Sequence, residues 1–446
     1  MPERVHAAVI ERELEWFYRT LETRLRLHFN QETSHRSIAD LPPPELNGDP
    51  GAYARLVAEH DFGPSERLVL ALALAPHLRP ALLDPLFIRN AAYDRPFTEF
   101  GGLPAAPGGF LPTVETALFL LAGDSLEDRL LAGRLFGPEH PFQRDRLLDP
   151  GNAEGGATPG QRPLRPAPPL LHALLTGETW RPRFGFEFPA RRLTTRLEWD
   201  DLILPPDTRR RLDEILAWMR HGRQLLDDPD LGRRLRPGLR ALFCGPPGTG
   251  KTLTAGLLGK ISGRDVYRID LSLVVSKYIG ETEKNLERVF AQAECQDWIL
   301  LFDEADALFG KRTQVKDAHD RFANQEISYL LQRVEDFAGV VILATNLREN
   351  LDDAFTRRFE SVVTFPMPGP EQMRQLWEAG FGRAYELESS IDLREVAQRH
   401  RLSGGSIMNV VRFCALRAVT RDTRIVRLRD LDEGIRRELH KEGKTA

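Results

Sequence analysis

The sequence predicts an α/β protein: a parallel sheet covered by helices in the second half of the chain, and a separate α-rich domain in the first half. From residue 197 onward, apolar segments of strand length alternate with helical segments, which is typical of a parallel sheet with helices on both faces. A glycine-rich loop at 245–252 separates the first apolar strand from a helix. Residues 1–190 contain no lysine and are rich in Leu, Ala, Arg and Pro. This change in composition indicates a distinct N-terminal domain.

The N-terminal domain is expected to cover residues 1–140. Its helical candidates are 5–27, 64–75, 114–121 and 126–135, chosen because apolar residues recur at helical spacing. Over 141–196 the composition changes, and the sequence GNAEGGATPG at 151–160 is followed by several prolines. Such a stretch predicts a linker or an irregular surface loop. A chain of 446 residues is long enough for two or three such domains.

The second half is expected to form an αβα core over 197–370 and a small helical subdomain over 371–446. The apolar strand candidates are 241–244, 265–269, 298–302, 340–344 and 361–365. The sequence PMPGP at 366–370 ends the last strand, because proline cannot donate a hydrogen bond to a neighbouring strand. Mainly helical candidates follow it.

The loop at 245–252 reads GPPGTGKT, which has the form of a phosphate-binding loop. Glycines let consecutive backbone N–H groups turn toward anionic oxygens, and the next helix presents its positive N-terminal end to the same charge. We expect Lys251 to reach the β- and γ-phosphates of ATP and the Thr252 hydroxyl to bind Mg²⁺. The predicted nucleotide-binding residues are Gly245, Pro246, Pro247, Gly248, Thr249, Gly250, Lys251, Thr252 and Leu253. A plain Gly/Pro turn is the alternative, and the strand before the loop argues against it.

Two adjacent carboxylates follow the strand candidate 298–302. Asp303 and Glu304 should therefore lie at the carboxyl edge of the sheet, where ligands bind in open α/β folds. Asp303 is placed to hold Mg²⁺ through its water shell, and Glu304 is placed to orient and deprotonate an attacking water. The alternative is a strand end capped by solvated acids, which the phosphate-binding loop disfavours.

Further along the chain, an amide and an arginine pair also follow or precede strands. Asn346 comes directly after the strand 340–345 and could position the water against the γ-phosphate, although Asn is also a common turn residue. Arg357 and Arg358 stand just before the last strand. They are either a surface pair or arginine fingers that reach into a neighbouring subunit's nucleotide.

Together, the motifs GPPGTGKT, LLFDEAD, LATN and AFTRRF resemble the AAA family of ring-forming ATPases, over about residues 198–438. The resemblance implies an αβα core with a helical lid, nucleotide bound between subunits, and a homo-hexameric ring. It assigns residues 198–203, with Asp201 and Ile203, to the adenine pocket. It assigns residues 402–407, with Gly404 and Gly405, to the start of a lid helix that closes over the nucleotide. Some AAA+ relatives carry a lid arginine in that motif, and this chain has glycines there.

Residues 276–281 resemble the aromatic, apolar, glycine pore loop of that family, with Lys277, Tyr278, Ile279 and Gly280. Tyr278 and Ile279 would face the channel of the ring. An exposed aromatic side chain on such a loop can grip a polypeptide without demanding a sequence. The alternative is that Tyr278 fills the core at a helix start. His319 and Asp320 belong either to a second pore loop or to a solvated polar turn.

A closer resemblance concerns the stretches 274–293 and 309–322. They are similar to the AAA ATPases encoded beside bacterial contractile injection systems, which are phage-tail-like particles. That family has an N-terminal domain of winged-helix type, and residues 62–76 fit its sequence. The resemblance therefore predicts a winged-helix-like domain over 1–140.

Composition narrows the function. The leading interpretation is an enzyme that hydrolyses ATP to ADP and phosphate and remodels a protein partner. A DNA-directed motor or loader is an alternative, but residues 1–195 contain more acids than bases, which is the wrong sign for binding phosphates. A nucleotide-gated scaffold without turnover is a third possibility, against which the intact Glu304 argues.

Location and partners are also constrained. The net charge is −4 with 28 % charged residues, and no apolar stretch approaches the roughly 20 residues that cross a bilayer. The first 30 residues do not resemble a signal peptide. Cys244, Cys295 and Cys414 are far apart in the sequence and read as small apolar residues of a reducing compartment. We therefore expect a cytoplasmic protein without nucleic-acid or membrane partners.

Overall fold

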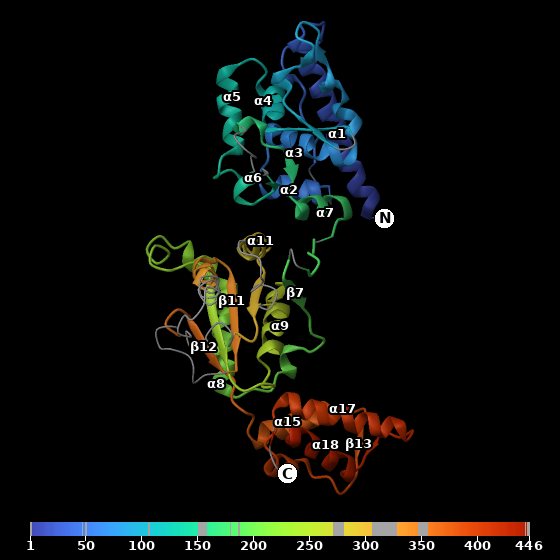
Figure 1. Ribbon diagram of the computed structural model, residues 1–446, viewed down its shortest axis with the longest axis vertical. Helices are drawn as coiled ribbons and strands as arrows, with labels where there is room; N and C mark the ends of the chain where they lie inside the picture. Colours follow the sequence, from blue (N-terminus) through green and yellow to red (C-terminus); the bar gives the residue numbers. More distant parts are fainter. Residues whose placement is uncertain are drawn as a thin grey trace, which may run out of the picture. The chain divides into compact units, whose positions relative to one another are not determined.

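The computed structural model divides into two compact units, Met1–Pro182 and Arg183–Ala446, described here one at a time (Figure 1). The residues that the structure describes are 2–46, 48–49, 51–105, 108–149, 158–178, 180–185, 188–270, 281–305, 328–346, 356–441 and 443.

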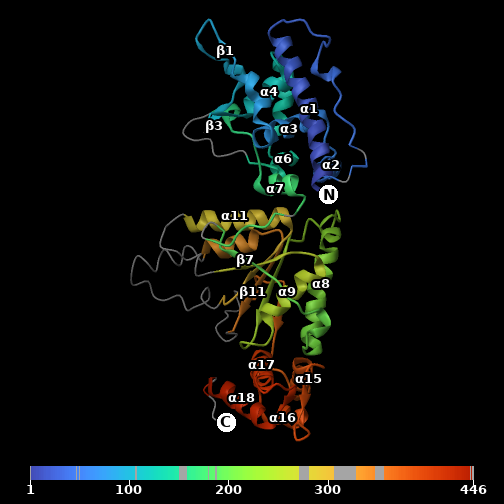
Figure 2. The same ribbon diagram turned by 90° about the vertical axis from the view of Figure 1, so that its right-hand side faces the viewer.

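The N-terminal unit is built mainly from helices around α3 (Pro64–Leu78). Every residue of α3 from Arg67 to Ala75 is buried, and the helix contacts α1 (Pro2–His28) and α4 (Val114–Ala122), which lie beside it in both views (Figure 1, Figure 2). The remaining helices are α2 (Ala52–Glu59), α5 (Leu126–Gly133), α6 (Pro141–Arg144) and α7 (Pro168–Thr176). Short 3-10 helices cover Ile38–Asp40, Pro80–Phe87, Thr98–Phe100, Arg134–Phe136 and Pro159–Gln161.

Three antiparallel strand pairs complete the described part of this unit. They are β1 (Arg89–Asn90) with β2 (Arg95–Pro96), β3 (Leu103–Ala105) with β4 (Gly109–Leu111), and β5 (Leu148–Asp149) with β6 (Arg165–Pro166). The unit is thus α-rich, as expected from its sequence. That it is of winged-helix type remains a prediction.

The segment 141–196, which we predicted to be a linker, contains ordered elements. Helix α6, the β5–β6 pair and helix α7 belong to the N-terminal unit. Leu148, Leu164 and Leu174 are buried in the same core as α3, so leucines between the prolines anchor this stretch. Strand β7 (Ala190–Leu193) joins the sheet of the second unit. The boundary between the units therefore lies near residue 182.

The second unit contains a six-stranded sheet in the order β12-β8-β11-β10-β9-β7. Its further strands are β8 (Leu239–Cys244), β9 (Val266–Ile269), β10 (Ile299–Phe302), β11 (Val340–Thr345) and β12 (Ser361–Thr364). Neighbouring strands run parallel, except that β7 pairs antiparallel with β9. The prediction of a purely parallel sheet is corrected in this respect, because β7 comes from the segment predicted as a linker.

Helices cover both faces of this sheet, which can be followed in Figure 2. All residues of β8, β10 and β11 are buried, as expected for strands packed on both sides. Helices α8 (Pro206–Leu226) and α9 (Lys251–Ser262) pack on one face, in a core that includes Phe243 and Ile342. On the other face, Phe290 of α11 (Glu281–Gln296) lies with its ring centroid 6.1 Å from that of Phe302. Residues 328–336 are also helical.

The C-terminal part of the second unit is a small helical subdomain. It contains α15 (Pro370–Phe381), α16 (Leu393–Arg399), α17 (Gly404–Thr420) and α18 (Leu428–Lys441). A short parallel pair, β13 (Glu386–Leu387) with β14 (Ile425–Val426), joins them. Trp377 is fully buried in its core beside Ile407 and Leu431. We call this subdomain, residues 370–441, the lid.

Two further observations bear on the sequence predictions. Among the described residues, no single helix is long and apolar enough to cross a membrane; one pair bent by 104°, α3 with the following 3-10 helix, meets that criterion only in combination. Cys244 and Cys414 are buried and Cys295 is exposed, and all are free thiols. Burial raises the pKa of the Cys414 thiol to about 12, so this thiol is unreactive at neutral pH.

Candidate functional site

The glycine-rich loop connects β8 to α9 at the carboxyl edge of the sheet. Gly248 and Gly250 have φ values of 75° and 101°, and Gly250 precedes the first residue of α9. Side chains other than glycine rarely adopt such angles. A Cβ atom at Gly248 would also lie 2.5 Å from the Ser403 hydroxyl oxygen of the lid. Glycine is therefore required at position 248 by both backbone conformation and space.

The side chain of Lys251 is buried beneath this loop. Its Nζ donates to the carbonyl oxygens of Gly245 at 2.6 Å and Pro246 at 2.9 Å. It also donates to Asn346 Oδ1 at 2.9 Å. Because β11 is the neighbour of β8, Asn346 at the end of β11 lies directly beside the loop. The structure thus brings together two residues that are 95 positions apart in the sequence.

Thr252 and Asp303 meet on the other side of the loop. The Thr252 hydroxyl donates to Asp303 Oδ2 at 2.9 Å. A hydroxyl and a carboxylate are oxygen ligands of the kind that Mg²⁺ prefers, and Mg²⁺ usually keeps waters and phosphate oxygens for its other positions. The described residues contain no group of three His, Cys, Asp or Glu that could hold a metal on its own. The pair therefore fits a Mg²⁺ ion that arrives with a nucleotide.

Glu304 has an unusual backbone conformation. Its φ is 54°, a left-handed value that costs a residue other than glycine roughly 1–2 kcal/mol. Its backbone N–H donates to Asp303 Oδ1 at 3.1 Å, and the N–H of Ala305 donates to the carbonyl of Ala344 at 2.9 Å. These bonds fix the turn after β10 and leave the Glu304 side chain exposed. An exposed carboxylate on a fixed turn can act on a solvent molecule.

The lid touches the loop at the first turn of α17. Ser403 caps this helix by accepting a hydrogen bond from the N–H of Ser406 at 3.1 Å. The N–H of Gly405 donates to the carbonyl of Gly248 at 2.9 Å. A Cβ atom at Gly405 would lie 3.1 Å from the Gly248 Cα. Gly404 and Gly405 thus lie at the phosphate-binding loop, as the sequence resemblance implied.

Arg357 and Arg358 are both exposed, but their surroundings differ. Arg358 forms an ion pair with Glu335. Arg357 makes no ion pair or hydrogen bond with any residue that the structure describes. The structure does not bring either arginine into contact with the loop residues of its own chain.

Comparison with known proteins identifies the domain that contains this site. Residues 241–367 match the model of the "ATPase family associated with various cellular activities (AAA)". The chain carries an AAA ATPase domain. The matched range includes the phosphate-binding loop, Asp303, Glu304, Asn346 and both arginines.

Individual relatives share this domain. The chain is 38 % identical over 131 residues to an uncharacterized AAA family ATPase, y4kL, of Sinorhizobium fredii, covering 29 % of this chain and 39 % of that protein. It is 29 % identical over 243 residues to the A-like 1 form of the katanin p60 ATPase-containing protein of Danio rerio, covering 50 % and 47 %. It is 29 % identical over 213 residues to the 26S proteasome regulatory subunit 6B homolog of Dictyostelium discoideum, covering 46 % and 53 %. The chain therefore spans about half the length of the relatives it matches.

The predicted adenine segment of the AAA domain is held by α8. Asp201 accepts a hydrogen bond from the N–H of Glu198 at 2.7 Å within a 3-10 helix, Trp199–Asp201. Arg209 lies 4.6 Å from the Trp199 ring centroid and donates to the carbonyl of Leu202 at 3.3 Å. Ile203 is half-buried. The segment is thus anchored, and its contact with adenine remains a prediction.

The predicted pore-loop residues Lys277, Tyr278, Ile279 and Gly280 lie outside the described residues, as do His319 and Asp320. Their roles therefore remain predictions.

Sequence reasoning missed two arginines. Arg268 on β9 has Nη1 3.7 Å from Asp303 Oδ2, so it adds positive charge beside the predicted metal ligand. Its signal was a charged residue in the otherwise apolar strand VYRI. Arg240 on β8 is buried and donates to both carboxylate oxygens of Glu360, at 2.6 Å and 3.0 Å. Burial raises the pKa of Glu360, but the hydrogen bonds from Arg240 outweigh it, and the pKa lies below its ordinary value.

Proposed function

We propose that the chain is an ATP-hydrolysing AAA enzyme that remodels a protein partner. One observation carries the enzymatic part: Lys251 contacts Asn346 while the adjacent Thr252 contacts Asp303. Residues from three strand ends thereby converge on a single phosphate-binding loop. The match of residues 241–367 to an ATPase family supports the same activity.

The chemistry follows from the positions of these groups. The backbone N–H groups of the loop and the Lys251 ammonium bind the phosphates. Thr252 and Asp303 hold Mg²⁺, which neutralises phosphate charge when bound. Glu304 accepts the proton of the attacking water, and the Asn346 amide orients that water toward the γ-phosphate. Arg357 supplies positive charge to the site of a neighbouring subunit, which requires a homo-oligomer, and we propose a hexameric ring.

The protein-remodelling part rests on sequence resemblance. The relatives include a katanin p60 protein and a regulatory component of the proteasome. The residues of the predicted pore loop, Tyr278 above all, are suited to gripping a polypeptide. The stretches 274–293 and 309–322 suggest an enzyme that serves a contractile injection system in the cytoplasm. In that setting the N-terminal unit would be a winged-helix-like domain that selects the partner.

The first experiment is to measure phosphate release from Mg²⁺-ATP by the purified full chain. We expect turnover by the wild type and none by Lys251→Ala, which should no longer bind ATP in a nucleotide-binding assay. An unfolded or model protein substrate should stimulate the wild-type rate, and double-stranded DNA should not. A wild-type chain that binds no ATP would contradict the enzymatic part. Stimulation by DNA alone would favour the DNA-directed motor.

The partner can then be sought with a variant that binds ATP without hydrolysing it. Glu304→Gln, tagged and expressed in the source cells, should retain partners that the wild type releases. Mass spectrometry of the retained proteins, compared with those retained by Lys251→Ala, identifies nucleotide-dependent partners. Identical protein sets from both variants would argue against ATP-driven remodelling.

A further inference from the structure

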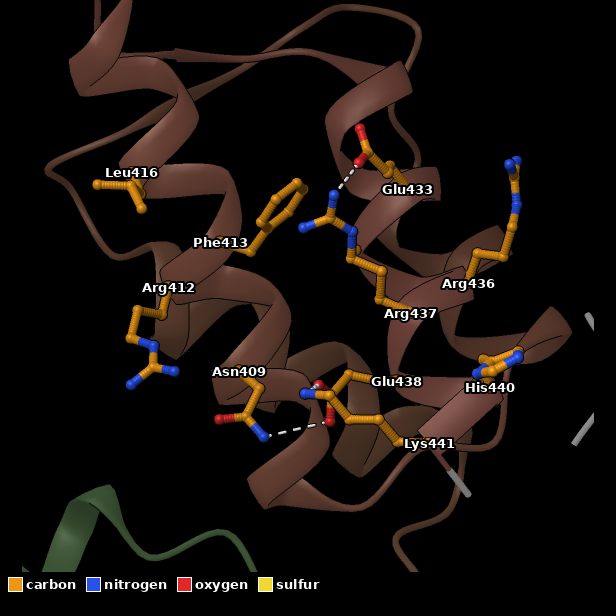
Figure 3. A pocket seen from close by; sticks show the side chains of 11 residues that line it. Asn409, Arg412, Phe413, Leu416, Glu433, Arg436, Arg437, Glu438, His440 and Lys441 are labelled. Atoms are coloured by element: carbon orange, nitrogen blue, oxygen red, sulfur yellow. Dashed lines mark hydrogen bonds and ion pairs between the residues drawn. The ribbon is translucent and has the colours of Figure 1, made fainter. Parts of the chain in front are cut away.

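The outer surface of the lid contains a groove of about 900 Å³ between α17 and α18 (Figure 3). The two helices approach closely at Gly434, where a Cβ atom would lie 2.8 Å from Val410 Cγ1 and 3.1 Å from the Phe413 ring. Phe413 is half-buried and faces the groove, and Leu416, one turn further along α17, is 65 % exposed. The groove thus combines an aromatic ring with an exposed aliphatic side chain.

The charges that line this groove do not balance. Glu433 pairs with Arg437 and lies 3.7 Å from Arg417. Glu438 pairs with Lys441 and accepts a hydrogen bond from Asn409 at 3.2 Å. Both lining carboxylates are therefore already neutralised by neighbouring groups.

Two exposed arginines remain at the rim. Arg412 on α17 and Arg436 on α18 have no carboxylate partner among the residues that the structure describes. Figure 3 shows their guanidinium groups extending away from the paired residues, on opposite sides of the groove. In addition, the guanidinium of Arg437 lies 4.4 Å from the centroid of the Phe413 ring. The groove consequently presents excess positive charge around an apolar centre.

We propose that this groove is a docking site for an acidic peptide segment of a partner protein. The segment would place an apolar side chain against Phe413 and Leu416, and carboxylates beside Arg412 and Arg436. Guanidinium groups bind carboxylates in a fork geometry, and opposite charge around an apolar anchor gives both specificity and fast association. The proposal goes beyond ATP hydrolysis and does not depend on it.

The site can be tested with a labelled peptide and the full chain. The probe is a short Asp/Glu-rich peptide with one central Phe, and binding is followed by fluorescence anisotropy at low salt. We expect binding tighter than about 1 mM, the weakest affinity worth assigning to a site. Arg412→Glu combined with Arg436→Glu should weaken it at least about tenfold, since two opposed rim charges are involved. Leu416→Ser should weaken it as well.

A matched control separates the site from net charge. Arg383→Glu combined with Arg394→Glu makes the same charge change on exposed lid residues that do not line the groove, and it should leave binding unchanged. Equal losses in both double variants would overturn the proposal. So would equal binding of a Lys/Arg-rich peptide, of a DNA oligonucleotide, or of a probe with Ala in place of Phe.

One further outcome assigns the groove differently. If the wild type binds no acidic peptide, and reversing Arg412 and Arg436 instead changes the oligomeric state measured by light scattering, the groove is a contact between copies of this chain. That result would overturn docking of a separate partner.

Discussion

The phosphate side and the arginine side of the AAA site differ in how far a single chain completes them. On the phosphate side, Lys251 contacts Asn346, and Thr252 contacts Asp303. These contacts exist without nucleotide, so this half of the site is preassembled. On the arginine side, Arg357 and Arg358 are exposed and touch none of these groups.

The two arginines also differ from each other. Arg358 is engaged by Glu335 of its own chain, whereas Arg357 has no ion pair or hydrogen bond within the described residues. A guanidinium that is already paired must lose its partner before it can reach a neighbouring molecule. The comparison therefore assigns the trans-acting role to Arg357 in preference to Arg358, a distinction that the sequence pair alone could not make.

The largest expected effect tests this distinction directly. Arg357→Ala should lower ATP hydrolysis by roughly 10³-fold, the usual contribution of an arginine finger, while ATP binding to the isolated chain stays normal. Arg358→Ala is the matched control, and it should cost far less because its guanidinium serves Glu335. Phosphate release and nucleotide binding are measured on both variants. Equal losses would show that the ion pair with Glu335 does not distinguish the two arginines.

Complementation shows whether Arg357 acts across an interface between two copies of the chain. Arg357→Ala keeps an intact phosphate-binding loop, and Lys251→Ala keeps intact arginines. Mixing the two inactive proteins should restore activity at interfaces where the intact halves meet. If a pull-down through a tag on one variant confirms mixed rings, and activity still stays at background at every ratio, the trans-acting role is wrong.

The next effect concerns the preassembled side. Glu304→Gln keeps the shape and the positive φ of this residue but removes the base, so hydrolysis should fall on the order of 10²-fold or more while ATP binding is retained. Thermal unfolding with and without ATP checks that the variant still folds and binds. Near-normal turnover would show that Glu304 is not the base.

The sequence predicted the preassembled side well because its residues occur in local motifs. The order strand, glycine loop, helix places Lys251 and Thr252, and a strand end places Asp303 and Asn346. Since the carboxyl ends of parallel strands meet at one edge, these motifs converge without any knowledge of distant contacts. The structure brings them together as expected.

The remaining features depend on pairings that no local pattern shows. The Arg240–Glu360 pair joins residues 120 positions apart, and the charges of each look like ordinary surface charges in the sequence. Strand β7, which reads Ala-Arg-Arg-Leu, has two exposed arginines and is recognisable only through its pairing with β9. The prolines at 159–169 suggested a linker, whereas the leucines between them decide the packing.

A third, smaller effect concerns the contact between the loop and the lid. Gly248→Ala would place a methyl group 2.5 Å from the Ser403 hydroxyl and impose left-handed strain. We expect nucleotide affinity to fall about tenfold, equivalent to about 1.4 kcal/mol of overpacking and strain. Gly263→Ala is the matched control, because Gly263 also has a positive φ, 71°, but open space around it. It should lower stability alone. Titration calorimetry distinguishes the two results.

The smallest effect concerns the anchor of the arginine segment. Glu360 has a folded pKa below its ordinary value of 4.5 because of Arg240. Its contribution to stability is therefore present above pH 4.5 and is lost as the pH falls through the folded pKa. Glu13 of the N-terminal unit, which pairs with Arg67, is the opposite case: burial raises its pKa above 4.5 despite Arg67. Its contribution is present below pH 4.5 and is lost as the pH rises through the folded pKa.

Hydrogen exchange of peptides from each unit can measure both trends. At each pH, the exchange rate of Glu360→Gln is divided by that of the wild type, so that the intrinsic pH dependence of exchange cancels. Around neutral pH, peptides of β8 and β12 should exchange about fivefold faster in the variant, which corresponds to about 1 kcal/mol for a charged but partly exposed pair. This ratio should approach one as the pH falls below the ordinary pKa. For Glu13→Gln, the ratio in α1 peptides should instead decrease as the pH rises. If both ratios change with pH in the same direction, burial does not outweigh Arg67 at Glu13, and the contrast between the two ion pairs fails.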